Sequence, residues 1–275
     1  DHIAEDMGGG GSRIVDFAIR VTSSEMICDI RGAADIMRSI SPEGGSVGAV
    51  SLRYWEPEGD LRYYIGSIYL FTTTASGYRD MTRADVPQLR FMLSSGGVYT
   101  FYDGTAAETP EVCMLGPTMG ATGFALREEA CVVGVSVLPL GWLALGCDDA
   151  DRWADRLYDV ASVHGAVWQD QLEQLRATIS DADSAIDGLW SFLRAQLRPA
   201  SGAMVDLVSK IDSWLSDSDS PQVEDIVAAT GLSARQLARY TNRLYGAPPK
   251  LLARKYRALR CASQIVIDKK NWIEL

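Results

Sequence analysis

The sequence predicts an α+β protein, with a β-rich barrel or jelly roll in its first half and helices in its second half. Between residues 47 and 147, short segments rich in β-branched and aromatic residues, such as VSLRYW and VYTFYD, are separated by turn-forming segments such as EPEG and SSGG. Short strands at this spacing are typical of sandwiches and barrels and not of βαβ units. From residue 148 onward, apolar residues recur every three or four positions, which is the spacing of amphipathic helices.

Length and composition indicate a globular chain of about two domains. The chain has 275 residues, of which 47% are hydrophobic and 9% aromatic, as in folded proteins. No apolar run approaches the ~18 residues of a membrane span and no secretory leader is recognisable, so we expect a cytoplasmic protein without a membrane partner. The five cysteines are scattered and lack CxxC spacing, which argues against a disulfide framework and a zinc site.

The composition divides the chain into four parts. Two short helices are expected around residues 14–19 and 33–40, ahead of the strands. The expected parts are a tag or flexible linker at 1–12, a β-rich domain with its helical extension at 13–147, a helical segment at 148–198 and a helix-turn-helix domain at 203–275.

The helical segment is predicted to contain three helices. The first begins at Asp148 and Asp149, either of which can cap it, and places Trp153, Leu157 and Val160 on one face. The other two have narrow apolar stripes, a pattern that packs helices as in coiled coils. The stripes are Trp168, Leu172, Leu175 and Ile179, and then Ile186, Leu189, Leu193 and Leu197.

These two stripes allow two arrangements. Their short length favours a helical hairpin within one chain. Their position just ahead of a linker also suits a contact between two chains. We expect a homodimer paired through residues 165–198, and the hairpin is the alternative.

A helix-turn-helix is predicted after Pro221. The first helix runs to about residue 229, Gly231 supplies the tight turn, Ser233 caps the second helix and Gly246 ends it. One face of the second helix is apolar and another has an arginine at every fourth position. The apolar face comprises Leu237, Tyr240, Thr241 and Leu244, and the basic face comprises Arg235, Arg239 and Arg243.

Basic charge gathers at this end of the chain. Residues 221–275 contain ten Lys or Arg against four Asp or Glu, a net charge of +6, although the whole chain has a net charge of −10. Guanidinium groups suit both phosphates and guanine edges, so we expect double-stranded DNA as a partner, with Arg235 and Arg239 in the major groove. The predicted DNA-binding residues are Ser233, Arg235, Gln236, Arg239, Arg243 and Lys250.

The stretch GLSARQLARYTNRLYGAPPKLLARKYRALRCA resembles the first helix-turn-helix and connecting helix of AraC/XylS-type transcriptional regulators. Thr241 departs from their pattern, which has an apolar aromatic residue there. The resemblance implies a DNA-binding unit with two such motifs. Since the sequence reaches NWIEL where the second would begin, we expect only the first here, and weak DNA binding by it alone. The matching positions are Gly231, Ser233, Arg235, Leu237, Arg239, Gly246, Pro249 and Arg257.

The β-rich domain resembles the N-terminal domain of one branch of these regulators, in the segments YWEPEGDLRYYIGSIYLF, VCMLGPTMGATGF and VVGVSVLPLGWLALGC. This resemblance implies a cupin-like domain that binds a small-molecule effector. Arg62 or Arg90 can face an anionic ligand, although solvent exposure is the simpler expectation for each. Aromatic candidates for the ligand pocket, each of which also fits a core position, are Tyr54, Tyr64, Tyr69, Phe71, Phe91, Tyr99, Phe101 and Trp142.

The sequence contains no recognisable catalytic constellation. GxSxG, P-loop and GxGxxG patterns are missing, and a metal-binding cupin needs more histidines than His2 and His164. We therefore expect no enzymatic activity, no metal and no cofactor. The prediction is a sequence-specific, effector-controlled transcriptional regulator of AraC type. The alternative is a small-molecule-binding or protein-interaction module whose basic end is a solvated face.

Overall fold

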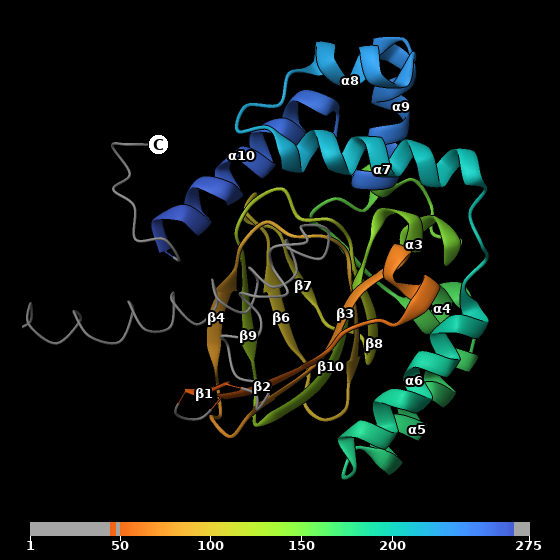
Figure 1. The fold of residues 1–275 in the computed structure, drawn as a ribbon. Helices are drawn as coiled ribbons and strands as arrows, with labels where there is room; N and C mark the ends of the chain where they lie inside the picture. The colour runs from red at the N-terminus through yellow and green to blue at the C-terminus, as the bar shows by residue number, and fades with distance from the viewer. Residues whose placement is uncertain (1–44, 48–49, 267–275) are drawn as a thin grey trace, which may run out of the picture.

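The computed structural model describes residues 45–47 and 50–266. It consists of two β-sheets with helices packed against them and a separate group of four helices at one end of the sheets (Figure 1). The expected linker at residues 1–12, the expected helices around 14–19 and 33–40, and residues 267–275 lie outside the described residues.

The larger sheet has seven strands in the order β1-β2-β3-β10-β5-β8-β11, and every neighbouring pair is antiparallel. The second sheet has four strands in the order β4-β9-β6-β7, also antiparallel. The bounds are β1 Gly45–Val47, β2 Val50–Trp55, β3 Ile65–Thr73, β4 Arg79–Thr82, β5 Gln88–Met92, β6 Gly97–Thr100, β7 Ala106–Glu108, β8 Val112–Leu115, β9 Thr122–Leu126, β10 Ala130–Val137 and β11 Leu157–Asp159.

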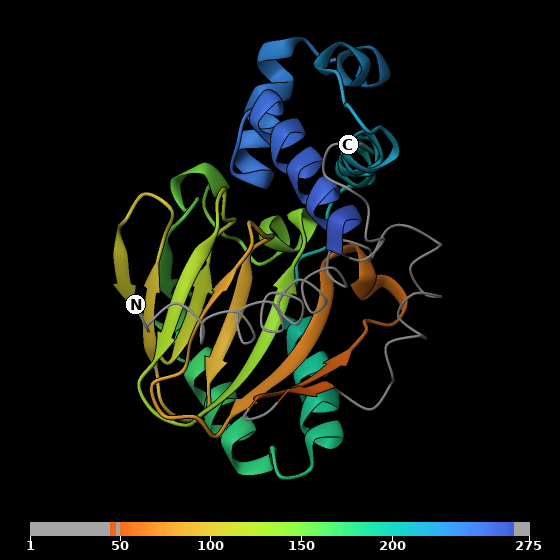
Figure 2. The same ribbon diagram turned by 90° about the vertical axis from the view of Figure 1, so that its left-hand side faces the viewer.

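The predicted barrel is not closed. Closure requires the edge strands to pair with each other, and in the described part of the chain the edges β1, β11, β4 and β7 have one neighbour each. The two sheets instead enclose a shared apolar interior, in which Met92 of the larger sheet packs with Leu126 of the smaller one. Figure 2 shows the sheets from the side, with the four-helix group above their ends.

Successive side chains of a strand point to opposite faces of the sheet, so odd and even positions contact different neighbouring layers. On β5, Leu89 and Phe91 are fully buried on the side that packs against helices, whereas Gln88, Arg90 and Met92 point to the space between the sheets. This alternation places Gln88 and Arg90 among the apolar residues inside the sandwich, and it places Leu89 and Phe91 beneath the helices.

The prediction of a helix that begins at Asp148 is wrong. The chain forms a short 3-10 turn, η2 (Ala150–Arg152), then strand β11 and helix α4 (Val160–His164). Strand β11 pairs with β8, so tertiary pairing with the sheet edge overrides the helical spacing of the apolar residues.

Helices α5 (Val167–Thr178) and α6 (Ala182–Gln196) form a hairpin within one chain that covers the outer face of the larger sheet. Leu172 and Leu193 are both 0% exposed, and the ring of Trp168 stacks on Phe91 at 6.4 Å. The stripes expected to pair two chains are thus buried against the sheet, so the predicted dimer contact is wrong. Homodimer formation by another surface stays a prediction.

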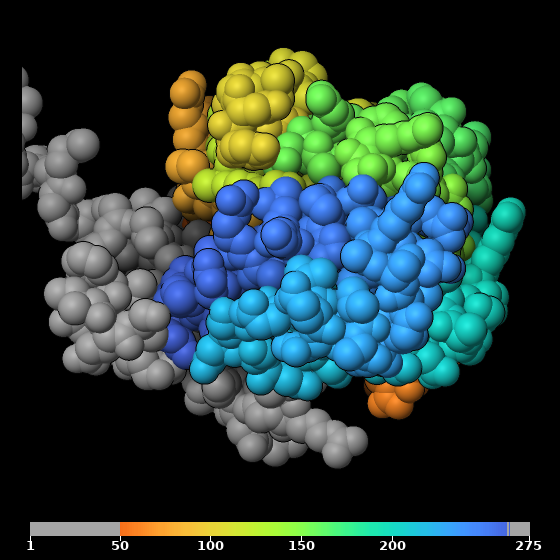
Figure 3. All heavy atoms as spheres, turned by 90° about the horizontal axis from the view of Figure 1, so that it is seen from above, coloured from red at the N-terminus to blue at the C-terminus, as the bar shows by residue number. Residues whose placement is uncertain are grey.

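The four-helix group, here called the helical unit, comprises α7 (Gly202–Asp217), α8 (Val223–Thr230), α9 (Ala234–Tyr245) and α10 (Pro249–Val266). Its buried residues include Ile211, Leu237 and Leu252, and Leu140 of α3 (Pro139–Ala144) belongs to the same core. Viewed from above, the unit lies directly on the residues of the sheets and their connections, here called the sensor (Figure 3).

Candidate nucleic-acid interface and effector cavity

The predicted helix-turn-helix is formed by α8 and α9. Gly231 ends α8 with φ of 70°, a left-handed conformation that favours glycine. Ser233 caps α9: the Gln236 main-chain N–H donates to the Ser233 hydroxyl at 3.3 Å, and the Ser233 main-chain N–H donates to the Gln236 side chain at 3.0 Å. Two predicted DNA-binding residues, Ser233 and Gln236, therefore fix the start of the helix in this structure.

Helix α9 is amphipathic, as predicted, with one correction. Leu237, Thr241 and Leu244 are buried, but Tyr240 is partly exposed and Tyr245 takes the inward position near the helix end. The Thr241 hydroxyl donates to the carbonyl of Ala238 at 3.2 Å, which satisfies a polar group in the core.

The three arginines of α9 are exposed on one side, and this side faces the sensor. Arg235 and Arg239 line a cleft whose opposite wall carries Asp149 and Asp151. The Arg243 Nε lies 3.5 Å from Asp149 Oδ1. The predicted DNA-binding arginines are thus brought together, beside carboxylates of the same chain.

Helix α10 contributes fewer free cations than the sequence suggested. Lys250 is exposed in its first turn, but Lys255 is buried and the Lys255 ammonium donates to the main-chain carbonyl of Asp85 at 2.7 Å. Arg260 donates to main-chain carbonyls at the end of α7, including that of Leu215 at 2.7 Å. Carbonyls at a helix C-terminus attract cations, so Arg260 joins α10 to α7 within the helical unit, whereas Lys255 joins α10 to the segment between β4 and β5.

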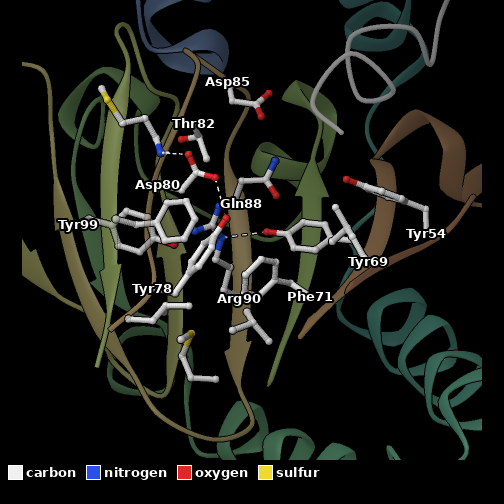
Figure 4. A pocket seen from close by; sticks show the side chains of 16 residues that line it. Tyr54, Tyr69, Phe71, Tyr78, Asp80, Thr82, Asp85, Gln88, Arg90 and Tyr99 are labelled. Atoms are coloured by element: carbon white, nitrogen blue, oxygen red, sulfur yellow. Dashed lines mark hydrogen bonds between the residues drawn. The ribbon is translucent and has the colours of Figure 1, made fainter. Parts of the chain in front are cut away.

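A cavity of about 110 Å³ lies between the two sheets of the sensor (Figure 4). Four of the eight predicted aromatic residues line it: Tyr54, Tyr69, Phe71 and Tyr99.

The other four predicted aromatics do not line the cavity. Phe91 and Trp142 belong to the core beneath the helices because their strand and helix faces point away from the space between the sheets. Phe101 packs with Leu115 in a separate cluster, and the main-chain N–H of Ala200 donates to the Tyr64 hydroxyl, at the contact with the helical unit.

Polar groups of the cavity gather around Arg90. The Arg90 Nε donates to the Tyr69 hydroxyl at 3.0 Å, and the guanidinium carbon lies 5.0 Å from the centre of the Tyr99 ring. The Tyr78 hydroxyl donates to Asp80 Oδ2 at 2.8 Å, and burial together with this carboxylate raises the pKa of Tyr78. Arg62, the other candidate for an anionic ligand, lies on a different surface.

Residue parity could have found the cavity residues that the sequence analysis missed. Tyr78, Asp80 and Thr82 line the cavity and alternate along the segment at β4, and Gln88, Arg90 and Met92 alternate in the same way on β5. Gly134 has a local role here, because a side chain at this position would collide with the Tyr69 ring. The glycine therefore lets Tyr69 lie across the neighbouring strand.

The described residues contain no group of three metal-ligating side chains. His164 ends α4 and lies 3.3 Å from the Tyr158 hydroxyl, and burial lowers its pKa. Among the described helices, none has the length and apolar character needed to cross a membrane.

No family model and no curated protein matches this chain. Similar solved structures include AraC-like regulators and cupin proteins. The AraC-like transcriptional activator CuxR aligns with 78% of this chain and 88% of its own, at 13% identity and a TM-score of 0.32. ToxT from Vibrio cholerae O395 aligns over 72% and 80%, at 10% identity and a TM-score of 0.37.

A cupin superfamily protein from Desulfitobacterium hafniense DCB-2 aligns with 34% of this chain and 81% of its own, at 20% identity and a TM-score of 0.27.

Proposed function

We propose that this chain is a sequence-specific DNA-binding transcriptional regulator of AraC type. The observation that carries the proposal is helix α9, which is capped at Ser233, follows α8 after the left-handed Gly231, and exposes an arginine at every fourth position. A second helix of this kind reads base edges in the major groove, while neighbouring cations contact phosphates. The function involves no catalysis.

We further propose that a small molecule bound between the sheets controls this activity. The cavity has aromatic walls and a few polar groups gathered at Arg90 and Asp80, which is the usual composition of a ligand pocket. Its volume of about 110 Å³ suits a compact ligand. The aromatic rings favour a flat apolar body, and Arg90 favours a hydrogen-bond acceptor on it.

The DNA proposal is tested with duplexes selected by the protein from a randomised library. Arg239→Ala is expected to weaken binding to the selected duplex by about 1–3 kcal/mol and to reduce the preference over random DNA, because it removes a base contact. Lys250→Ala is expected to weaken binding to both duplexes equally, because it removes a phosphate contact. Fluorescence anisotropy at fixed salt measures both effects.

Arg79→Ala serves as the charge-matched control, since Arg79 is exposed on strand β4 of the sensor. Equal losses on both duplexes for Arg239→Ala and Lys250→Ala would refute the assigned roles. If the unaltered chain binds no duplex, the alternative of a non-DNA binding module with a solvated basic face becomes the better explanation.

A further inference from the structure

Three carboxylates of the sensor gather beside the basic face of α9. They belong to Asp148, Asp149 and Asp151, around the 3-10 turn η2, and this segment is here called the acidic turn. Asp148 is held by Arg152, with 2.9 Å between Arg152 Nη1 and Asp148 Oδ2. Asp149 and Asp151 line the wall of the cleft opposite the arginines of α9.

The acidic turn and the end of α9 are in close contact. Gly246, which ends α9 with φ of 79°, lies so near the sensor that an added Cβ would be 2.5 Å from Pro117 Cγ and 3.2 Å from the Ala150 carbonyl oxygen. Ala150 is 0% exposed and Ala247 is 1% exposed. A side chain larger than hydrogen is therefore excluded at position 246, where the end of α9 packs closely against the turn.

The turn is anchored to the sensor at its start, where the indole N–H of the buried Trp142 donates to the Asp148 carbonyl at 2.7 Å, and through the residues that follow it. The Gly116 main-chain N–H donates to the Arg156 carbonyl at 2.9 Å, and the Met119 main-chain N–H donates to the Asp155 carboxylate at 2.8 Å. The carboxylates thus project from a fixed support and not from a free loop.

We infer that the acidic turn is a docking surface for the basic face of α9 and competes with DNA for it. The inference rests on the proposed function of α9. A helix that reads DNA enters a major groove about 12 Å wide, with a phosphate backbone along each side. Because Arg243 Nε lies 3.5 Å from Asp149 Oδ1, no duplex fits between the turn and this part of α9, and the acidic wall of the cleft repels phosphates. DNA binding therefore requires the turn and α9 to separate.

The test compares Asp149→Asn/Asp151→Asn with Asp170→Asn/Asp187→Asn, which makes the same charge change at exposed positions of α5 and α6. The probe is a labelled random-sequence duplex, followed by anisotropy at low and at physiological salt. We expect the acidic-turn variant to bind about 3- to 30-fold more tightly than the control variant, since two exposed charge interactions are removed. The difference should shrink as salt rises.

Hydrogen exchange of residues 234–245 in the DNA-free protein gives a second readout. We expect faster exchange in the acidic-turn variant only, because α9 loses packing contacts when it leaves the turn and then unfolds locally more often. If the acidic-turn variant matches the control in both affinity and exchange while the unaltered chain binds DNA, the inference is overturned and the proposed function stands. If neither variant nor the unaltered chain binds the duplex, the proposed function is overturned. The inferred competition between the acidic turn and DNA is then overturned as well.

Discussion

At the scale of single residues, Lys255 illustrates how a basic helix can be misjudged from sequence. The side chain lies between the helical unit and the sensor and is only 8% exposed. Burial, together with the nearby Arg83, lowers the pKa of Lys255 to about 8, against the opposing effects of Asp85 and Asp155. The difference from the ordinary value of 10.5 corresponds to about 3 kcal/mol against the charged form.

This burial predicts a pH dependence of stability. Below pH 8 Lys255 is charged in both the folded and unfolded states, so its contribution is constant. Between pH 8 and 10.5 the unfolded state binds more protons, so the free energy of unfolding rises with pH. Lys255→Met should lack this rise, which amounts to at most about 3 kcal/mol, because the titrating group is removed.

Urea unfolding of the two proteins at several pH values between 7 and 10 measures the difference. The comparison between proteins is needed because burial raises the pKa values of Cys113 and Cys147 to about 11, which lowers stability over part of the same range. Arg254→Met, an exposed neighbour on α10, is the control. Parallel pH profiles for unaltered chain and Lys255→Met would contradict the prediction.

At the scale of elements, the sequence predicted well where local and tertiary preferences agree. Helix α9 has a cap at Ser233, a glycine stop at Gly246 and strong amphipathicity, and all three features are present. The segment from Asp148 to Val160 has helical spacing, but the edge of the larger sheet recruits Leu157–Asp159 as β11. A sheet edge formed by a strand distant in sequence leaves no local signal.

Half of the aromatic residues predicted for a ligand pocket line the cavity between the sheets, and half do not, for a related reason. Aromatic residues on strands are recognisable, but the face to which each one points depends on register. Tyr69 and Phe71 share the inner face of β3, whereas Phe91 lies one residue out of step with Arg90 and points outward. The contact between α9 and the acidic turn could not be predicted from the sequence, because local sequence patterns do not show which distant parts of a chain meet.

The burial of the hairpin α5–α6 predicts a large stability effect. Leu172→Ala should lower the free energy of unfolding by about 2–5 kcal/mol, because it leaves a cavity in the core beneath the larger sheet. Gln174→Ala, at an exposed position of the same helix, should have little effect. Urea unfolding measures both variants.

Sedimentation of the folded Leu172→Ala protein tests the corrected role of the hairpin. Its oligomeric state should equal that of the unaltered chain, since Leu172 packs inside one chain. A variant that dissociates with unchanged stability would restore the original expectation of a dimer contact through residues 165–198.

At the scale of the whole molecule, the sensor and the helical unit share a core. Leu140 of the sensor is 2% exposed and is surrounded by residues of the helical unit, including Val208 and Leu252. The Lys255 ammonium also bonds the main chain of the sensor at Asp85. These contacts hold α9 near the acidic turn, so the separation of the two parts that we infer for DNA binding has to disrupt apolar packing.

This shared core predicts that the two parts unfold together. Calorimetry of the unaltered chain should show one transition, because separating the parts would expose Leu140 and the apolar residues of the helical unit that pack around it. Leu140→Ala should divide the transition into two, since it weakens the contact between the parts. Leu89→Ala leaves a cavity in the sensor core alone, so it should shift a single transition to lower temperature. Two well-separated transitions in the unaltered chain, or one in Leu140→Ala, would show that the parts are not coupled through this residue.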